Sequence, residues 1–219
     1  MTRWTASELS GLVGSLPTAT ISGKWWHQGP VGRSFLFCPD PSRGPGRYHR
    51  AGGPGAWYAS SSMRASWCEL FRHFMEGATV DPFEVKRLAG RIKVSGLKVL
   101  DLCDPDVLVK LHITSDDLRG DDYAVCHELA DAARSCGMDG VLAPSAGLPG
   151  QRTIALFPET VDGGSVEEQH SRVQVPSINL MDVLENVRAT PAHKSEFAKY
   201  TARLRRIGRA AAGRYYRRR

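Results

Sequence analysis

Hydrophobic residues follow two different periods along this chain, and both periods predict regular structure. A helical spacing of acidic, apolar and small residues over 121–137, closed by Gly137, predicts a helix. A second helix is predicted over residues 60–77, with serines at its start, Gly77 at its end and one apolar stripe made of Trp67, Leu70, Phe71 and Phe74. Shorter helices are expected over residues 5–16 and 105–112.

Other segments are rich in β-branched and apolar residues and predict strands. Residues 17–55 contain many glycines and prolines, so we expect long loops there with short strands such as 34–38. The remaining expected strands are 56–60, 82–96, 97–104, 139–145 and 151–159. This order of strands and helices favours an α+β fold with a largely antiparallel sheet and flanking helices.

The chain divides by composition into a body and a basic end. Residues 200–219 contain eight arginines and no acid, while the net charge of all 219 residues is +6, so the body carries −2. We expect a first domain over residues 1–175, with its core at about 25–160. A peripheral segment over 176–219 is expected to hold a strand, a helix and the arginine-rich tail.

Composition excludes several classes of protein. Five cysteines occur without a C-x-x-C pair, which argues against a disulfide framework or a zinc site. No run of about 18 apolar residues exists, and the first 20 residues lack a secretory pattern. We therefore expect a cytoplasmic protein with reduced cysteines and no metal. A serine hydrolase is also disfavoured, because no G-x-S-x-G motif occurs.

One glycine-rich stretch, residues 44–55, suggests a binding loop. Glycines permit close approach of the backbone to a ligand, and Arg47 and Arg50 could hold phosphates in bidentate fashion. An ordinary loop is the alternative, because the stretch matches no phosphate-loop or dinucleotide fingerprint. Taken alone, helix geometry slightly favours a solvent-facing position for Glu69, and Ser145 fits the common role of a turn-initiating hydroxyl.

Considered together, these motifs resemble the RES family, which is named for an arginine, a glutamate and a serine. The resemblance covers residues 25–160 and rests on the order and spacing of six motifs. They are Gly46-Arg47-Tyr48-His49, Gly53-Pro54-Gly55, Ala56-Trp57-Tyr58-Ala59, Glu69, Gly140-Val141-Leu142-Ala143-Pro144-Ser145 with Gly150, and Ile154-Ala155-Leu156-Phe157. This chain departs from the family at His49, where asparagine is common, and at Ala146, where arginine is common.

The resemblance implies an ADP-ribosyltransferase-like fold with a split sheet, and a toxin that cleaves the nicotinamide–ribose bond of NAD+ by phosphorolysis or hydrolysis. NAD+ is then the substrate, no prosthetic group is needed, and an Xre-type antitoxin is the expected protein partner. Glu69, Arg47 and Tyr58 are the expected catalytic residues. The expected NAD+ contacts are Arg47, Tyr48, His49, Arg50, Tyr58 and Ser145, with Arg47 on the diphosphate and Ser145 on the ribose or carboxamide.

Two other functions compete with this hypothesis. Transfer of ADP-ribose to a protein would use the same residues, because the acceptor is chosen by loops around the pocket. A nucleic-acid-binding protein is suggested by the arginine tail and its tyrosines at 200, 215 and 216. A solvated extension, or a docking segment for an acidic partner, explains such a tail better than specific nucleic-acid recognition does.

Overall fold

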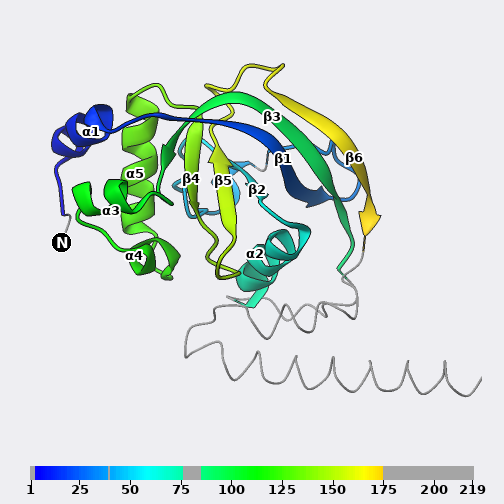
Figure 1. The fold of residues 1–219 in the computed structure, drawn as a ribbon. Coiled ribbons are helices and arrows are strands. Elements are labelled where there is room, and N and C mark those ends of the chain that lie inside the picture. Colours follow the sequence, from blue (N-terminus) through cyan, green and yellow to red (C-terminus); the bar gives the residue numbers. More distant parts are fainter. Residues whose placement is uncertain (1–2, 39, 76–84, 175–219) are drawn as a thin grey trace, which may run out of the picture.

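A six-stranded sheet forms the centre of the protein. The structure, a computed structural model, describes residues 3–38, 40–75 and 85–174. The strand order is β1-β2-β5-β4-β3-β6, and β1 also pairs with β3, so that five strands close into a ring (Figure 1). Among the strand pairs, β3–β4 is parallel and the others are antiparallel. The expected α+β class and largely antiparallel sheet are confirmed, whereas a closed ring replaces the expected split sheet.

Two long strands close this ring. β1 (Ala19–Pro30) pairs with β3 (Arg87–Asp101) from Ala19–Val99 to Pro30–Arg87. The sequence analysis was wrong to place loops over β1, and wrong to break β3 into two strands at Gly96. Gly23 lies at a register shift of β1, and Gly96 has a φ of 69° inside β3. These glycines therefore bend long strands and do not end them.

The other four strands are shorter: β2, β5 and β4 complete the ring between β1 and β3, and β6 pairs with β3 outside the ring. β2 (Trp57–Ser60), β4 (Gly140–Pro144) and β5 (Arg152–Leu156) match the predicted positions. The predicted strand 34–38 is absent, although Phe35 is buried. β6 (Val166–Gln174) was not predicted, because most of its residues are polar and exposed, and it is held by backbone pairing with β3.

Helices cover the sheet at two places (Figure 1). Four helices gather on one side of the sheet, at the left of this view: α1 (Ala6–Ser15), α3 (Pro105–Lys110), α4 (Ser115–Arg119) and α5 (Ala124–Ser135). A fifth helix, α2 (Met63–Met75), lies near the lower ends of β4 and β5 in the same view. Thr5 and Glu8 form a capping box at the start of α1. α4 was not predicted, and a short 3-10 helix occupies Pro41–Arg43.

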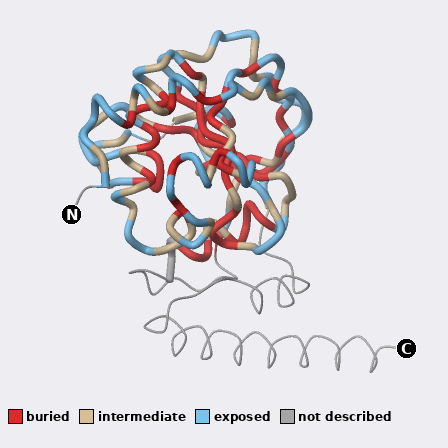
Figure 2. The backbone as a smooth tube through the Cα atoms, turned by 60° about the vertical axis from the view of Figure 1, so that its left-hand side comes forward, coloured by how far each residue is buried: buried red, intermediate tan, exposed pale blue. Residues whose placement is uncertain are grey.

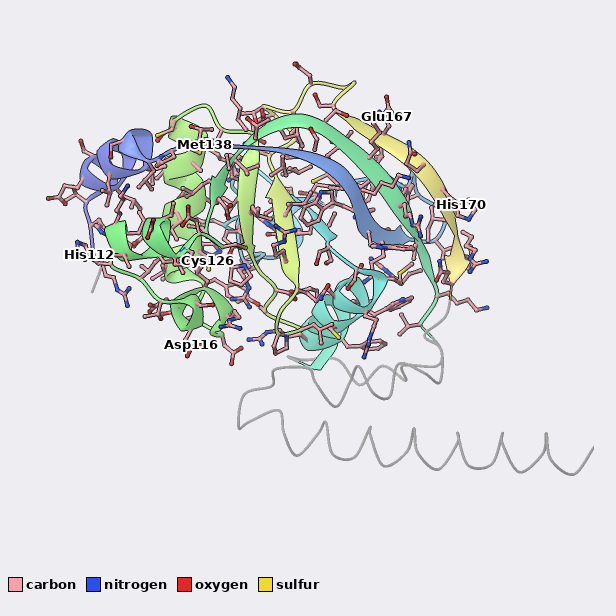
Figure 3. The ribbon with its side chains drawn as sticks, in the orientation of Figure 1. His112, Asp116, Cys126, Met138, Glu167 and His170 are labelled. Atoms are coloured by element: carbon pink, nitrogen blue, oxygen red, sulfur yellow. The ribbon has the colours of Figure 1, made fainter. Side chains whose placement is uncertain are left out.

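Two hydrophobic clusters fill the protein, and Figure 2 shows the buried positions gathered in its middle. The first lies between the sheet and α1, α3, α4 and α5, and contains Cys126 and Met138 (Figure 3). The second takes residues from all five ring strands, namely Trp25, Trp57, Val99, Leu142 and Ile154 among others. Because strand side chains alternate between faces, β4 and β5 contribute to both clusters.

The predicted segment 176–219, with its strand, helix and arginine tail, lies outside the described residues. None of the helices described is both long and apolar enough to cross a membrane.

Candidate functional site

A cavity of about 250 Å³ lies among α2, β1, β2 and the segment that joins β4 to β5. Four of the predicted site residues line it, namely Arg47, Tyr48, Tyr58 and Glu69. They come from a loop, a strand and a helix that are separated by up to 22 positions, so only folding brings them together. The other lining residues are His27, Gln28, Ala56, Trp57, Ser60, Ser66, Leu70, Arg87, Pro144, Ala146 and Thr153.

Glu69 is anchored through one of its two carboxylate oxygens. Oε1 accepts hydrogen bonds from Ser145 Oγ at 2.6 Å, from Gly147 N at 3.0 Å and from Thr153 Oγ1 at 3.3 Å. Within the described part of the chain, no donor contacts Oε2. The side chain is thus held in one orientation, and one oxygen remains for a ligand in the cavity.

The segment after β4 is built around this carboxylate. The Ser145 hydroxyl donates to Glu69 and also accepts from Leu148 N at 3.0 Å. Ser145 is buried and is not among the cavity-lining residues, and its hydroxyl is engaged by Glu69 and by Leu148 N. A Cβ at Gly147 would lie 2.7 Å from Glu69 N, so only glycine lets this segment pack so closely on α2.

An arginine of α2, Arg72, also holds the same segment against this helix. Its Nη1 donates to Ala146 O at 3.1 Å, while Nη2 donates to Arg119 O at 2.9 Å and pairs with Asp121 at 2.5 Å. Arg72 follows Glu69 by three positions, so both side chains lie on one helical face. The sequence analysis did not select Arg72, although this i,i+3 spacing was a signal that could have identified it.

Arg47 lines the cavity and is itself anchored. Its Nη1 donates to Leu118 O at 3.0 Å and to Gly120 O at 2.7 Å, and its guanidinium lies 4.5 Å from the centre of the Tyr123 ring. The guanidinium also interacts with the Cys126 thiol, and no further oxygen acceptor of the described residues contacts its N–H groups. Arg47 therefore joins the glycine-rich loop to the α4–α5 connection and still has donors available.

The glycine-rich loop is shaped first by protein contacts. Tyr58 OH accepts from Tyr48 N at 2.9 Å and lies 3.0 Å from His49 Nδ1. A Cβ at Gly46 would overlap the His49 ring and lie 2.7 Å from Tyr58 OH. Gly46 therefore makes room for these two rings. Burial raises the pKa of Tyr58, so its hydroxyl stays protonated at neutral pH.

Arg50 lies elsewhere. Its Nε pairs with Asp131 on α5 at 2.9 Å, and the residue lines a different hollow between α1 and α5. The sequence placed Arg50 with Arg47 because both flank the same glycines. Although only three positions separate them in the loop, Arg47 lines the cavity and Arg50 pairs with α5.

Several lining residues were not selected from the sequence. His27 is one of them: its Nδ1 lies 2.7 Å from Tyr58 O, and its ring stacks on Trp57 with 3.9 Å between the ring centres. Burial, with a smaller effect from the charge of Arg87, lowers the pKa of His27 to about 4. Gln28 and Arg87 carried no motif, and their proximity depends on the pairing of β1 with β3.

Some buried polar atoms of the cavity lining have no hydrogen-bond partner among the described residues. They include Gln28 Oε1, Trp57 Nε1 and Arg87 Nε. Such atoms are costly unless water or a ligand satisfies them. Across the described ranges, no group of three His, Cys, Asp or Glu side chains is placed to hold a metal ion.

This chain is similar to several known proteins. The family model described as "RES domain" matches residues 19–180. A Mycobacterium tuberculosis protein named probable NAD(+) phosphorylase Rv3189 is 42% identical over 204 residues, which cover 93% of this chain and 97% of that protein. The NAD(+) phosphorylase MbcT of Mycobacterium bovis is 33% identical over 110 residues, which cover 49% of this chain and 59% of MbcT.

A solved structure shares the fold. It is the M. tuberculosis MbcT–MbcA toxin-antitoxin complex, which has a TM-score of 0.66 and 22% sequence identity, and the match covers 81% of this chain and 96% of the solved chain.

Proposed function

This chain belongs to the RES domain family, and we propose that it is an NAD+ phosphorylase that acts as the toxin of a toxin–antitoxin pair. The observation that carries the proposal is that Glu69 and Arg47 share one cavity, and that Glu69 Oε2 has no partner among the described residues. The name of the relative that is 42% identical supports the same reaction.

The reaction needs few protein groups. Nicotinamide leaves NAD+ as a neutral molecule from a cationic ring, so no general acid is required, in contrast to most glycoside hydrolysis. Positive charge develops on the ribose as the bond breaks. We assign its stabilisation to Glu69 Oε2, because three donors on Oε1 fix the carboxylate before the substrate binds.

The remaining residues bind and position. The free N–H groups of Arg47 would donate to the diphosphate, and the rings of Tyr48 and Tyr58 would form the wall against the nicotinamide-ribose end. His49 would orient Tyr58 through the contact of its Nδ1 with Tyr58 OH. Ser145 would act through Glu69 and not through a ribose hydroxyl.

We also propose that the fold is a variant of the ADP-ribosyltransferase type and that an antitoxin protein, of the Xre type that the family resemblance implies, neutralises this enzyme. The neighbour with a TM-score of 0.66 is a toxin solved with its antitoxin, and that likeness supports the pairing.

A direct assay tests the reaction. Purified protein is incubated with NAD+, with and without inorganic phosphate, and free nicotinamide and the ADP-ribose product are measured. Phosphate-dependent release of nicotinamide with formation of ADP-ribose 1-phosphate is expected. Equal rates without phosphate would indicate hydrolysis, ADP-ribose found on protein by mass spectrometry would indicate a transferase, and no nicotinamide release at all would reject the proposal.

A further inference from the structure

Arg87 is a cavity-lining arginine without a counter-ion among the described residues. No described acid forms an ion pair with it, and its buried Nε has no hydrogen-bond partner within the described ranges. Burial lowers the pKa of Arg87, and no carboxylate of the described ranges offsets this effect. A partly buried guanidinium without compensation is costly, which points to an anion that binds beside it.

Gln28 supplies a complementary group at the same place. Its Nε2 donates to Ser66 O at 2.5 Å, which fixes the amide so that Oε1 is the acceptor left over. That buried Oε1 lacks a partner among the described residues. Because Gln28 is opposite Ala89 and Pro30 is opposite Arg87, the two side chains are diagonal neighbours on one face of the sheet.

This pair lies next to the expected reaction centre. Ser66, which fixes Gln28, precedes Glu69 by three positions on α2, so both face the same side of the helix. Ser66, Glu69, Gln28 and Arg87 all line the one cavity. A ligand held by Gln28 and Arg87 would therefore be close to the carboxylate.

We propose that Arg87 and Gln28 form the acceptor subsite, in which inorganic monohydrogen phosphate is held beside Glu69. Arg87 donates to the phosphate oxygens, and the hydroxyl of the phosphate donates to Gln28 Oε1. This inference rests on the proposed phosphorolysis and assigns its second substrate to named residues.

Two other ligand groups fit less well. The diphosphate of NAD+ has no hydroxyl proton at neutral pH and cannot donate to Gln28 Oε1. A nicotinamide carboxamide could satisfy both side chains, but it would leave the charge of Arg87 uncompensated and would place a cationic ring beside that charge. Monohydrogen phosphate supplies both the negative charge and the donor.

The chemistry balances with groups already named. An unprotonated phosphate oxygen forms a bond to the ribose carbon while the carbon–nitrogen bond breaks. The electron pair of that bond leaves with nicotinamide, which becomes neutral. The product is ADP-ribose 1-phosphate, whose remaining phosphate proton is lost to water.

Steady-state kinetics of Arg87→Met provide the test. We expect the KM for phosphate to rise about 10–100-fold, because hydrogen bonds to a charged group are lost, while the KM for NAD+ changes less than about threefold. Arg91→Met is the matched control, since Arg91 lies on the same strand, is exposed and stacks on Trp26 at 4.7 Å outside the cavity. An unchanged KM for phosphate, or an equal loss for both substrates, would reject the subsite.

Anion selectivity tests Gln28 separately. Arsenate carries a hydroxyl at neutral pH and sulfate does not, so arsenate should compete with phosphate at least tenfold better than sulfate. Gln28→Met should abolish that preference. If nicotinamide inhibition weakens in Arg87→Met while the KM for phosphate stays constant, the pair binds the carboxamide instead and the proposal is wrong.

Separate controls distinguish loss of the subsite from misfolding of the variant and from failure of the proposed reaction. Thermal unfolding shows whether Arg87→Met is folded, and Arg87→Lys, which retains the charge, should keep part of the phosphate affinity. Calorimetric titration of inorganic phosphate, with and without ADP-ribose, measures the subsite even if NAD+ is not cleaved. Phosphate binding that is identical in the parent, Arg87→Met and Arg87→Lys proteins would overturn the assignment.

Discussion

The two arginines of the cavity, Arg47 and Arg87, differ in what holds their guanidinium groups. Arg47 donates to two backbone carbonyls and lies over an aromatic ring, so it organises the loops around it. Arg87 has no described partner. One arginine thus contributes to the architecture as well as to binding, while the other keeps its whole charge for a ligand. Removing them should therefore have different consequences for stability and activity.

Glu69 contains the same contrast within one side chain, because Oε1 is anchored and Oε2 is not. Glu69→Gln keeps an oxygen for the three donors and removes the negative charge. We expect kcat to fall about 10²–10³-fold with little change in the KM for NAD+ or in thermal stability. Release of nicotinamide measures this.

Glu167→Gln is the control for that variant, because Glu167 lies on β6 at the outer edge of the sheet (Figure 3). Activity of Glu69→Gln at the level of the Glu167→Gln protein would contradict the role of the carboxylate.

Removing the anchored arginine should weaken both binding and folding. Arg47→Met leaves Leu118 O and Gly120 O without their donor, so we expect the free energy of unfolding to fall by about 2–3 kcal/mol, together with a higher KM for NAD+. Arg87→Met should leave stability unchanged or raise it by up to about 1 kcal/mol. Urea denaturation of both variants compares them, and equal destabilisation would remove the distinction between the two arginines.

The buried histidine beside the cavity should make stability depend on pH. His27 is neutral in the folded protein above about pH 4, while in the unfolded chain its pKa is near 6.5. The unfolded state therefore binds the proton first, and stability is lost as pH falls from about 6.5 to 4, by about 3 kcal/mol. Above about pH 7 this contribution is constant.

Denaturation curves at pH 7.5, 5.5 and 4.5 measure that loss. His27→Gln should show a smaller decrease than the parent, and His170→Gln, at an exposed position of β6, should show the same decrease as the parent. If the free energy of unfolding falls equally with pH in the parent and in His27→Gln, protonation of His27 is not the cause of the loss.

The smallest expected effect concerns the segment that anchors Glu69. In Gly147→Ala the new methyl group would lie 2.7 Å from Cys68 C and Glu69 N, which are backbone atoms that cannot move aside independently. We expect a loss of about 1–3 kcal/mol in stability and a reduced kcat from displacement of the carboxylate. Gly164→Ala, where no heavy atom lies within 4 Å of the new carbon, should behave like the parent.

The sequence determined the local features of this protein. Short-range signals located α1, α2, α5, β2, β4 and β5, because capping residues, apolar periodicity and terminal glycines act within one or two turns. The order of motifs also selected Arg47, Tyr58 and Glu69, which the structure brings to one cavity.

Only the tertiary structure decided the rest. Strand pairing between residues about 60–90 positions apart created β1 and β6 as regular strands and placed Gln28 beside Arg87. The same long-range packing turned Ser145 toward Glu69 and directed Arg50 to α5. Such contacts depend on which backbones meet across the sheet, and no periodicity within a single segment records that.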